Sequence, residues 1–507
     1  MLELKNLSIN LSINDRELVS GLNFTLHPGD KAVIVGEEGN GKSTLLKLIY
    51  DEGLVSGYCR FGGQILKKGR LAYLPQAFPE ESLDISVGEY FGEAEPQMDA
   101  HIFKTLSRLG LTADFLASPR IIRTLSGGEK IKVQLAKILA STPDIILLDE
   151  PTNDIDLTAL AWLEDFINIC GKPVLFVSHD ETLIENTANI IIHLEQLMRK
   201  TKCKATIAKS GYGDYVEARG LAFGKQMQVA KKQRSDHKAK MERWRQIYDR
   251  VDHEQRIITR QNPGGGRLLK KKMKAVKSTG KRLERGAEDF LDIPEMEEAI
   301  LTKFPPEISI PKGKEVLSLE LPCLCIGGKQ LSGAVELNIN GPERVGIIGN
   351  NGAGKSTLLK EIWHILKERK DICAAYMPQD YAEVLDYEAS VIDFLAADSH
   401  KDTITKVRTY LGSMKFNHDE MLSKTGKLSG GQKAKILFLD MVLKGADVLI
   451  LDEPTRNFSP LSAPEIRRTL AAFGGAIISI SHDRKYLAEV CSKVYELTAD
   501  GLYPANA

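Results

Sequence analysis

The stretch GEEGNGKST at residues 36–44 decides the fold of this chain. It follows the apolar run KAVIV at residues 31–35 and precedes the helix-forming segment LLKLIY. Such a loop lets backbone N–H groups converge on phosphate oxygens, while its lysine reaches the β- and γ-phosphates and its serine can ligate Mg²⁺. A plain glycine-rich turn needs neither the lysine nor the serine. The residues expected to hold a nucleotide here are Gly36, Gly39, Gly41, Lys42, Ser43 and Thr44.

Further motifs follow in the first half of the chain. Gln76 ends the strand-like LAYLPQ, and LSGGE at residues 125–129 opens a helix with Ser126, Gly127 and Gly128. In IILLDE, Asp149 ends an apolar strand and suits an outer-shell Mg²⁺ partner, while Glu150 is placed to polarise an attacking water. In VLFVSHD, His179 follows another strand, where it could sense a γ-phosphate. Gln76 or His179 alone would not indicate a nucleotide site. They do so here because they occur in order with the other motifs.

The second half repeats this order. GNNGAGKST at residues 349–357, LSGGQ at 428–432, VLILDE at 448–453 and SHD at 481–483 recur, and most equivalent positions are 303 apart. A repeat this regular indicates a tandem duplication. The second set of site residues is Gly349, Gly352, Gly354, Lys355, Ser356, Thr357, Gln379, Ser429, Gly430, Gly431, Asp452, Glu453 and His482.

Composition excludes several classes of protein. With 507 residues and 43% hydrophobic content, the chain is long enough for two or three globular domains. No apolar run approaches the roughly 18 residues of a membrane span, so we expect no membrane partner. The N-terminus has no secretory pattern, and the seven cysteines have no metal-ligand spacing. We therefore expect a cytoplasmic protein with reduced thiols and no zinc or iron–sulfur cluster.

The middle of the chain, residues 213–291, is strongly basic. Residues 225–285 contain 20 Lys and Arg against 6 Asp and Glu, whereas the whole chain is balanced at 68 against 68. Helix formers dominate until QNPGGGR at residues 261–267, where Pro and three Gly predict a turn at 262–266 between two antiparallel helices. A solvated coiled-coil spacer is the alternative, but spacers mix the two signs of charge. Excess positive charge suits a phosphate backbone.

At this point the motif set resembles that of ABC ATPases, with a Walker A loop, Q-loop, signature, Walker B glutamate and switch histidine in each half. Two such cassettes on one chain with a long basic linker resemble the ABC-F family of ribosome-binding ATPases. The segments SGYGDYVEAR at 210–219 and LKKKMKAVKS at 269–278 are similar to that family too. The resemblance implies an α/β fold with two tandem ABC-type P-loop ATPase domains joined by a helical hairpin. The expected boundaries are 1–212, 213–300 and 301–507, with the hairpin tip at 262–266.

Within the family, EPTRNFSPLS at residues 453–462 resembles the antibiotic-resistance subgroup. Equal spacing of 50 residues from Gln76 to Ser126 and from Gln379 to Ser429 leaves no room for an added arm, which again favours that subgroup. The resemblance implies binding at the ribosomal exit site, with the 213–291 hairpin contacting rRNA and P-site tRNA and protecting the peptidyl-transferase centre. A translation factor for stalled ribosomes, or a cytosolic ATPase partner of a transport or DNA-processing complex, remains the alternative.

The resemblance also assigns roles. Glu150, Glu453, His179 and His482 would be catalytic, and Ser43, Gln76, Ser356 and Gln379 would hold Mg²⁺ through bound ATP. Cassettes pair head to tail within a monomer, so Lys42 would work with Ser429, and Lys355 with Ser126. The D-loop residue Ser459 would then border the Lys42 site, and Asp156 the Lys355 site. Residues 10–16 and 324–330 contain no Tyr, Phe or Trp to stack on a base, so the residues themselves leave ATP and GTP open.

Overall fold

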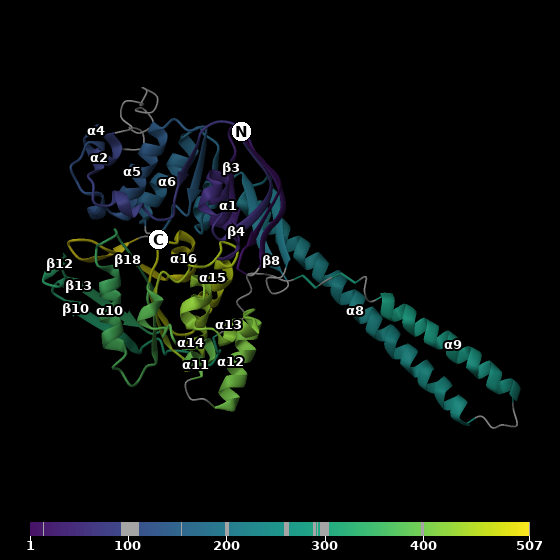
Figure 1. The fold of residues 1–507 in the computed structure, drawn as a ribbon. Coiled ribbons are helices and arrows are strands. Elements are labelled where there is room, and N and C mark those ends of the chain that lie inside the picture. The colour runs from purple at the N-terminus through teal and green to yellow at the C-terminus, as the bar shows by residue number, and fades with distance from the viewer. Residues whose placement is uncertain are drawn as a thin grey trace. The chain divides into compact units, whose positions relative to one another are not determined.

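The computed structural model describes residues 1–13, 15–92, 111–153, 155–197, 202–257, 263–286, 290–291, 293–294, 304–396 and 400–505. It divides into two compact units, one made of Met1–Tyr212 with Glu297–Ala507 and the other of Gly213–Met296. Within the larger unit we call residues 1–208 the first repeat and residues 304–505 the second repeat. The predicted α/β architecture, with two P-loop domains and a helical hairpin between them in the chain, is confirmed (Figure 1).

A six-stranded sheet forms the centre of the first repeat. Its order is β5(Leu71–Leu74), β6(Ile145–Asp149), β7(Val174–Val177), β3(Lys31–Val35), β8(Ile190–Leu197) and β9(Lys202–Ala208), and only β9 runs antiparallel to its neighbour. Continuous Val, Ile and Leu runs make β3, β6 and β7 buried on both faces, as parallel strands covered by helices must be. A second sheet, in the order β2(Glu17–Leu26), β1(Leu2–Leu11) and β4(Cys59–Lys67), is antiparallel.

The helices of the first repeat follow its strands. They are α1(Lys42–Tyr50), α2(Val87–Gly92), α4(Ala113–Leu116), α5(Gly127–Ala140), α6(Leu157–Ile169) and α7(Glu181–Thr187). Because parallel strands all end at one edge of a sheet, α1 after β3, the acidic pair after β6 and α7 after β7 begin at the same edge. This edge is where the site residues gather.

The second repeat has the same central topology. Its sheet runs β15(Ala374–Met377), β16(Val448–Asp452), β17(Ala476–Ile480), β14(Arg344–Ile348), β18(Lys493–Leu497) and β19(Leu502–Ala505). Two antiparallel pairs accompany it, β10(Glu315–Leu321) with β13(Val335–Asn340) and β11(Leu324–Ile326) with β12(Lys329–Ser332). Its helices are α10(Lys355–Leu366), α11(Val391–Leu395), α12(Lys401–Ser413), α13(His418–Leu422), α14(Gly430–Lys444), α15(Ala463–Ala471) and α16(Arg484–Val490).

The smaller unit is a helical hairpin of α8(Tyr212–Ile257) and α9(Pro263–Gly286). The two helices are joined by side-chain contacts, since Trp244 Nε1 donates to the Val276 carbonyl at 2.8 Å and the Trp244 ring covers Gly280, where a Cβ would lie only 2.7 Å from it. Val251 and Met273 are buried along the hairpin. At 46 residues, α8 is about 69 Å long.

The predicted turn at 262–266 is wrong over most of its length. Residues 263–266 already form the first turn of α9, and residue 262 lies outside the described residues. Proline is well suited to the first helical turn, where its missing N–H would have no intrahelical partner, so PGGG begins this helix and does not interrupt one. Residues 295–300, at the predicted end of the linker domain, also lie outside the described part of the chain. Among the described residues, no helix combines the length and apolarity needed to cross a membrane.

Candidate active sites

Both phosphate-binding loops have backbone conformations that require glycine at their first position. Gly36 has a φ of 149°, and a Cβ there would lie 2.3 Å from the Leu194 carbonyl oxygen. Gly349 has a φ of 144°, and a Cβ there would lie 2.4 Å from the Leu497 carbonyl oxygen. In each loop the neighbouring strand of the sheet, β8 or β18, therefore leaves no room for a side chain at the first glycine. Left-handed φ values recur at Gly39, Gly41, Gly352 and Gly354.

The two loop lysines begin α1 and α10 and are buried. Lys42 Nζ donates to the carbonyl oxygens of Gly36 at 2.9 Å and Glu37 at 3.2 Å. Lys355 Nζ donates in the same way to Gly349 at 2.7 Å and Asn350 at 3.1 Å. Each ammonium group thus lies inside its own loop.

A buried carboxylate faces the serine of each loop. Ser43 Oγ donates to Asp149 Oδ1 at 2.7 Å, and Tyr73 donates to Asp149 Oδ2 at 2.9 Å. Ser356 makes the equivalent hydrogen bond to Asp452. Burial raises the pKa of both aspartates above its ordinary value, although these hydrogen bonds oppose the rise.

The next residue in each strand end is the predicted catalytic glutamate. Glu150 and Glu453 have left-handed φ values of 48° and 53°. A non-glycine residue held there costs of order 1–3 kcal/mol and is found disproportionately at functional sites. The same outlier at both equivalent positions is a second indication, besides the motif, that these glutamates belong to functional sites.

Glu150 is held by two side chains. His179 Nε2 lies 3.1 Å from Glu150 Oε1, and Asn153 Nδ2 donates to Oε2 at 3.1 Å. Burial alone would raise the pKa of Glu150, but His179, followed by Lys42, outweighs it and holds that pKa at about 2. Because the second ring nitrogen of His179 faces the Phe458 carbonyl at 2.7 Å, both nitrogens face acceptors. This glutamate is therefore ionised at neutral pH.

Glu453 has a different environment. His482 Nε2 lies 3.7 Å from Glu453 Oε1, and the main hydrogen bond is from the His482 backbone N–H to Oε2 at 3.3 Å. Burial, followed by the neighbouring Asp452 carboxylate, raises the pKa of Glu453 to about 8. Burial, followed by Lys355, lowers the pKa of His482 to about 4. At neutral pH this pair is therefore an uncharged acid beside an uncharged imidazole.

A cavity of about 330 Å³ surrounds the first set of predicted residues. Its lining comes from both repeats: Glu38, Gly39, Gly41, Lys42, Ser43, Thr44, Gln76, Glu150, Asn153, His179, Arg456 and Asn457. A cavity of about 450 Å³ surrounds the second set, including Gly352, Gly354, Lys355, Ser356, Thr357, Gln379, Asp452, Glu453 and His482. First-repeat residues Thr152, Asn153, Ile155 and Leu160 also line the second cavity.

The predicted head-to-tail pairing is visible at the Lys42 site. Ser429 caps α14, accepting from Gln432 N at 3.3 Å, and two residues later the Gly431 backbone N–H donates to Glu38 Oε2 at 2.7 Å. Glu38 belongs to the same loop as Lys42. The helix that begins with Gly430 and Gly431 thus points its N-terminus at the first phosphate loop.

The D-loop of the second repeat also reaches this site. Ser459 Oγ donates to Glu37 Oε1 at 3.3 Å, and Ser462 Oγ donates to the same oxygen. Ser459 and Ser462 are buried. The structure therefore places Ser459 beside the Lys42 loop, as the sequence predicted from the position of the D-loop.

The Lys355 site is assembled less completely. Ser126 caps α5 and accepts from Glu129 N at 3.2 Å, followed by Gly127 and Gly128, but none of these three is among the residues that line the Lys355 cavity. Asp156 is closer, since its charge acts on the pKa of both Lys355 and His482. Of the two predicted partners of the Lys355 site, Asp156 therefore lies near it. The Ser126 segment does not line its cavity.

The residues of both sites fit a nucleotide with Mg²⁺. Hydroxyl, carboxylate and amide oxygens are the hard donors that Mg²⁺ takes, and Ser43, Gln76, Ser356 and Gln379 supply them in the two cavities. In the second cavity Asp452 Oδ2, Glu453 Oε1 and His482 Nδ1 are buried without hydrogen-bond partners among the described residues. Buried polar atoms facing a cavity are the groups a polar ligand would satisfy.

Sequence reasoning missed four residues of these sites. Glu37 and Glu38 bind the second repeat, Asn153 positions Glu150, and Arg456 lines both cavities. A signal was present: the second loop has Asn350 and Asn351 in place of the two glutamates, and Arg456 is the counterpart of Asn153 at the 303-residue offset. The repeat itself marks where the two sites differ.

Comparison with known families supports the repeat. The family described as ABC transporter matches residues 19–153 and 333–456, one match in each repeat. Two curated relatives match over nearly the whole chain. The "Probable ATP-binding protein YheS" of Escherichia coli strain K12 is 28% identical over 96% of this chain and 77% of its own length. The "ABC transporter F family member 2" of Arabidopsis thaliana is 25% identical over 98% of this chain and 76% of its own length.

A solved structure shares the fold. The complex of the archaeal ribosomal stalk protein aP1 with the archaeal ribosome recycling factor aABCE1 matches with a TM-score of 0.60, over 98% of this chain and 90% of that chain. At 18% identity the likeness concerns the fold alone.

Proposed function

The chain belongs to the ABC transporter family as an ABC-F ATP-binding protein with two cassettes, and from this premise we propose that it works on the ribosome. It is an ABC-type ATPase with two nucleotide-binding cassettes. In the proposed role it binds a bacterial-type ribosome at the tRNA exit site, and its hairpin reaches toward P-site tRNA and the peptidyl-transferase centre. There it protects the ribosome from antibiotics, and ATP hydrolysis releases it.

The surface of the α8–α9 hairpin carries this proposal. Arg243, Arg245, Lys270, Lys271 and Lys274 are all exposed. Residues 225–285 hold 20 basic against 6 acidic residues. Each contact of such a side chain with a phosphate releases counterions, which drives binding to nucleic acid. The archaeal protein of similar fold is described as a ribosome recycling factor, which agrees with a ribosomal partner.

The far end of the hairpin carries two of the most exposed apolar side chains of its two helices. Ile257, the last residue of α8, is 63% exposed, and Leu268 in the second turn of α9 is 70% exposed. Exposed apolar side chains at the end of a basic hairpin suit contact with stacked bases or with a bound apolar drug. The basic side chains along both helices would supply affinity for the ribosome. The apolar side chains at the far end would carry out the protection from the drug.

The chemistry at each site is hydrolysis of ATP. The loop glycines and Lys42 or Lys355 bind phosphates, and Glu150 or Glu453 polarises the attacking water. Ser43 with Gln76, and Ser356 with Gln379, would hold Mg²⁺, which when bound neutralises charge on the phosphates. His179 links the first site to the second repeat through the Phe458 carbonyl, so a change at Glu150 reaches the surface between repeats.

Ribosome binding can be tested by co-sedimentation. The Glu150→Gln/Glu453→Gln protein, loaded with ATP, should sediment with 70S ribosomes, because binding is retained when hydrolysis is blocked. Replacing Lys270, Lys271 and Lys272 by Gln should weaken binding, and log affinity should fall with log salt by about 0.9 or less for each phosphate contact. A matched control replaces the exposed Lys360 and Lys367, which lie outside the hairpin, by Gln. Absence of co-sedimentation at low salt would overturn the proposal.

Drug protection needs a separate test. In susceptible cells, the intact protein should raise the inhibitory concentration of at least one antibiotic acting at the peptidyl-transferase centre. Ile257→Ser with Leu268→Ser should abolish that resistance and leave ATPase activity and co-sedimentation nearly unchanged. Ribosome binding without resistance to any such drug would instead favour the translation factor for stalled ribosomes.

A further inference from the structure

The two repeats meet through a charged contact that is made twice with its charges inverted. Arg467 Nη2 in α15 lies 2.7 Å from Glu181 Oε2 at the start of α7. Arg484 Nη2 at the start of α16 lies 2.5 Å from Glu164 Oε1 in α6. Positions 164 and 467 are equivalent in the repeat, as are 181 and 484, because both pairs are 303 apart. The first repeat supplies the acid in both contacts and the second repeat supplies the guanidinium.

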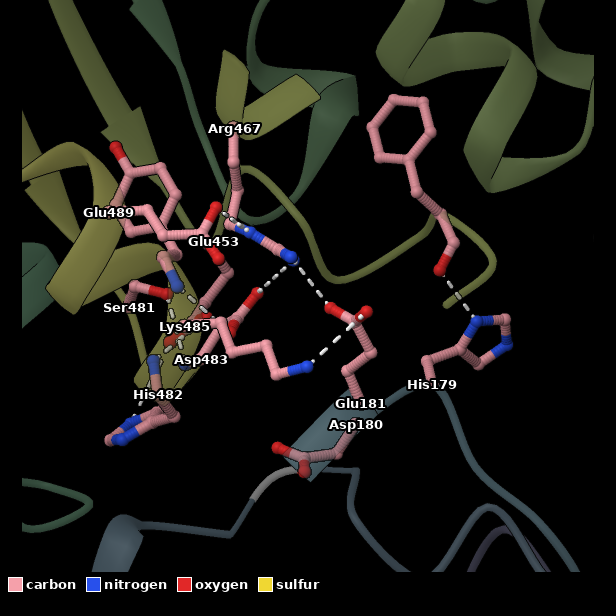
Figure 2. Close-up of polar contacts among 12 residues, drawn as sticks. His179, Asp180, Glu181, Glu453, Arg467, Ser481, His482, Asp483, Lys485 and Glu489 are labelled. Atoms are coloured by element: carbon pink, nitrogen blue, oxygen red, sulfur yellow. Dashed lines mark hydrogen bonds and ion pairs between the residues drawn. The ribbon is translucent and has the colours of Figure 1, made fainter. Parts of the chain in front are cut away.

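One member of each contact is also held from within its own repeat. Asn186 Nδ2 donates to Glu164 Oε1 at 3.0 Å, and Arg467 Nε donates to Glu489 Oε2 at 2.8 Å. Positions 186 and 489 are again 303 apart. Glu164 and Arg467 therefore each have one partner within their own repeat and one across the contact. Figure 2 shows Arg467 between Glu489 of its own repeat and Glu181 of the first.

Burial makes the sign of these charges important. The Arg467 and Glu181 side chains are only 3% and 8% exposed, and Glu164 is 13% exposed. Taking such charges out of water is costly unless an opposite charge meets them, and like charges in the same place cost several kcal/mol. Arg484 is 32% exposed, so solvent would relieve a mismatch least at the Arg467–Glu181 contact.

A third contact has the same polarity. Lys485 Nζ lies 2.5 Å from Glu185 Oε1. It also lies 3.5 Å from Glu181 Oε1 (Figure 2). Its equivalent in the first repeat is Thr182, so this contact is made once. Two further carboxylates, Asp180 and Asp483, occupy equivalent positions in the two repeats. Asp180 lies 3.9 Å from Arg484 of the other repeat, and Asp483 lies 4.0 Å from Arg467 of its own repeat.

We propose that these charges make the pairing of the repeats directional, so that each surface fits the other repeat and rejects a second copy of itself. Two first repeats placed in this geometry would set Glu164 against Glu181. Two second repeats would set Arg467 against Arg484. Discrimination by mismatched charge needs no loss of affinity for the correct partner. The correct occupant is the other repeat of the same chain, since a tether raises its effective concentration.

Cross-linking of the full-length chain tests this inference. The background carries Glu185→Cys and Lys485→Cys, which removes the third contact and leaves the two inverted ones, with the exposed Cys323, Cys325 and Cys373 replaced by Ser. A short bis-maleimide should then give an intrachain product. Glu164→Arg with Glu181→Arg should reduce that product by about tenfold or more, and so should Arg467→Glu with Arg484→Glu. The combined reversal carries all four changes together with Asn186→Glu and Glu489→Asn, so that each reversed side chain also meets the neighbour that its equivalent has in the parent. It should restore the product to within about twofold, because the charges are again opposite.

The control reverses an exposed ion pair inside the second repeat, Lys360→Glu with Glu383→Lys, and should change nothing. A double reversal that cross-links as well as the parent overturns the inference, as does a folded combined reversal that fails to recover. Circular dichroism shows which variants fold. If the combined reversal does not fold, the neutral Glu164→Gln, Glu181→Gln, Arg467→Gln and Arg484→Gln chain decides. It should keep the intrachain product and add interchain dimers, and absence of those dimers at high concentration would also overturn the inference.

Discussion

The Lys42 site and the Lys355 site contain the same motifs in the same order, yet they differ in charge and closure. At the Lys42 site, Glu38 accepts from Gly431 N at 2.7 Å and Glu150 is held by His179 at 3.1 Å. At the Lys355 site the loop carries Asn350 and Asn351 instead of glutamates. There Glu453 Oε1 has no hydrogen-bond partner among the described residues.

This difference shows that a sequence motif determines where a catalytic group lies in the fold. The residues around that group determine whether it is protonated. Glu150 has a pKa of about 2 because His179 and Lys42 outweigh its burial. Glu453 has a pKa of about 8 because burial and Asp452 prevail. The histidine partners differ correspondingly, since His179 is engaged at both nitrogens while His482 Nδ1 is without a partner in the described structure.

The largest effect should come from removing both carboxylates. Glu150→Gln with Glu453→Gln should lower steady-state ATP turnover by about 100-fold or more, the usual contribution of a general base. ATP binding, measured by equilibrium titration, should remain, because the phosphate loops are untouched. Glu361→Gln, an exposed position on α10, serves as the control. Turnover at the parent rate in the double variant would exclude both glutamates from catalysis.

Single variants sharpen the comparison. At pH 7 Glu150→Gln should cost more turnover than Glu453→Gln, because Glu150 is ionised there and Glu453 is protonated. Single-turnover measurements with each variant would give the two residual rates. If the rates are equal, the different surroundings of the two glutamates have no catalytic consequence.

The pH profile should then distinguish the sites. In the Glu150→Gln background, activity depends on Glu453, whose pKa is raised to about 8, so the base form increases as pH rises through that value. Residual turnover should rise about tenfold between pH 7 and pH 9. In the Glu453→Gln background, Glu150 is ionised throughout this range and the profile should be flat. A flat profile in both would show that Glu453 does not act as the base of its site.

The smallest effect should come from the loop glutamates. Glu37→Asn with Glu38→Asn gives the first loop the residues of the second and removes the carboxylates that bind Ser459, Ser462 and Gly431 N. Hydrogen bonds to charged groups are worth about 1.5–3 kcal/mol when buried and less when exposed, so we expect a loss of about 1 kcal/mol in urea unfolding. The reciprocal change, Asn350→Glu with Asn351→Glu, should give no matching gain in unfolding free energy. A gain would show that the contact between a phosphate loop and the other repeat depends on the loop residues alone.

Much of this protein follows from its sequence alone. The phosphate-loop motifs at residues 36–44 and 349–357 predicted a strand before each loop and a helix after it. The structure has β3 and α1 around the first loop and β14 and α10 around the second. Local pattern suffices for this because a glycine-rich turn, an apolar strand and a helix are each specified by neighbouring residues. The 303-residue offset predicted two equivalent sites for the same reason.

Other features depended on the tertiary structure. The first turn of α9 was mistaken for the hairpin turn, since PGGG suits a helix start as well as a loop and only the fold chooses between them. The different environments of Glu150 and Glu453 arise from His179, Asp452 and burial, which no local pattern specifies. The inverted contacts of Glu164 and Glu181 with the two arginines join residues about 300 positions apart. Sequence places each residue on its element, but charge and protonation depend on which elements the fold brings together.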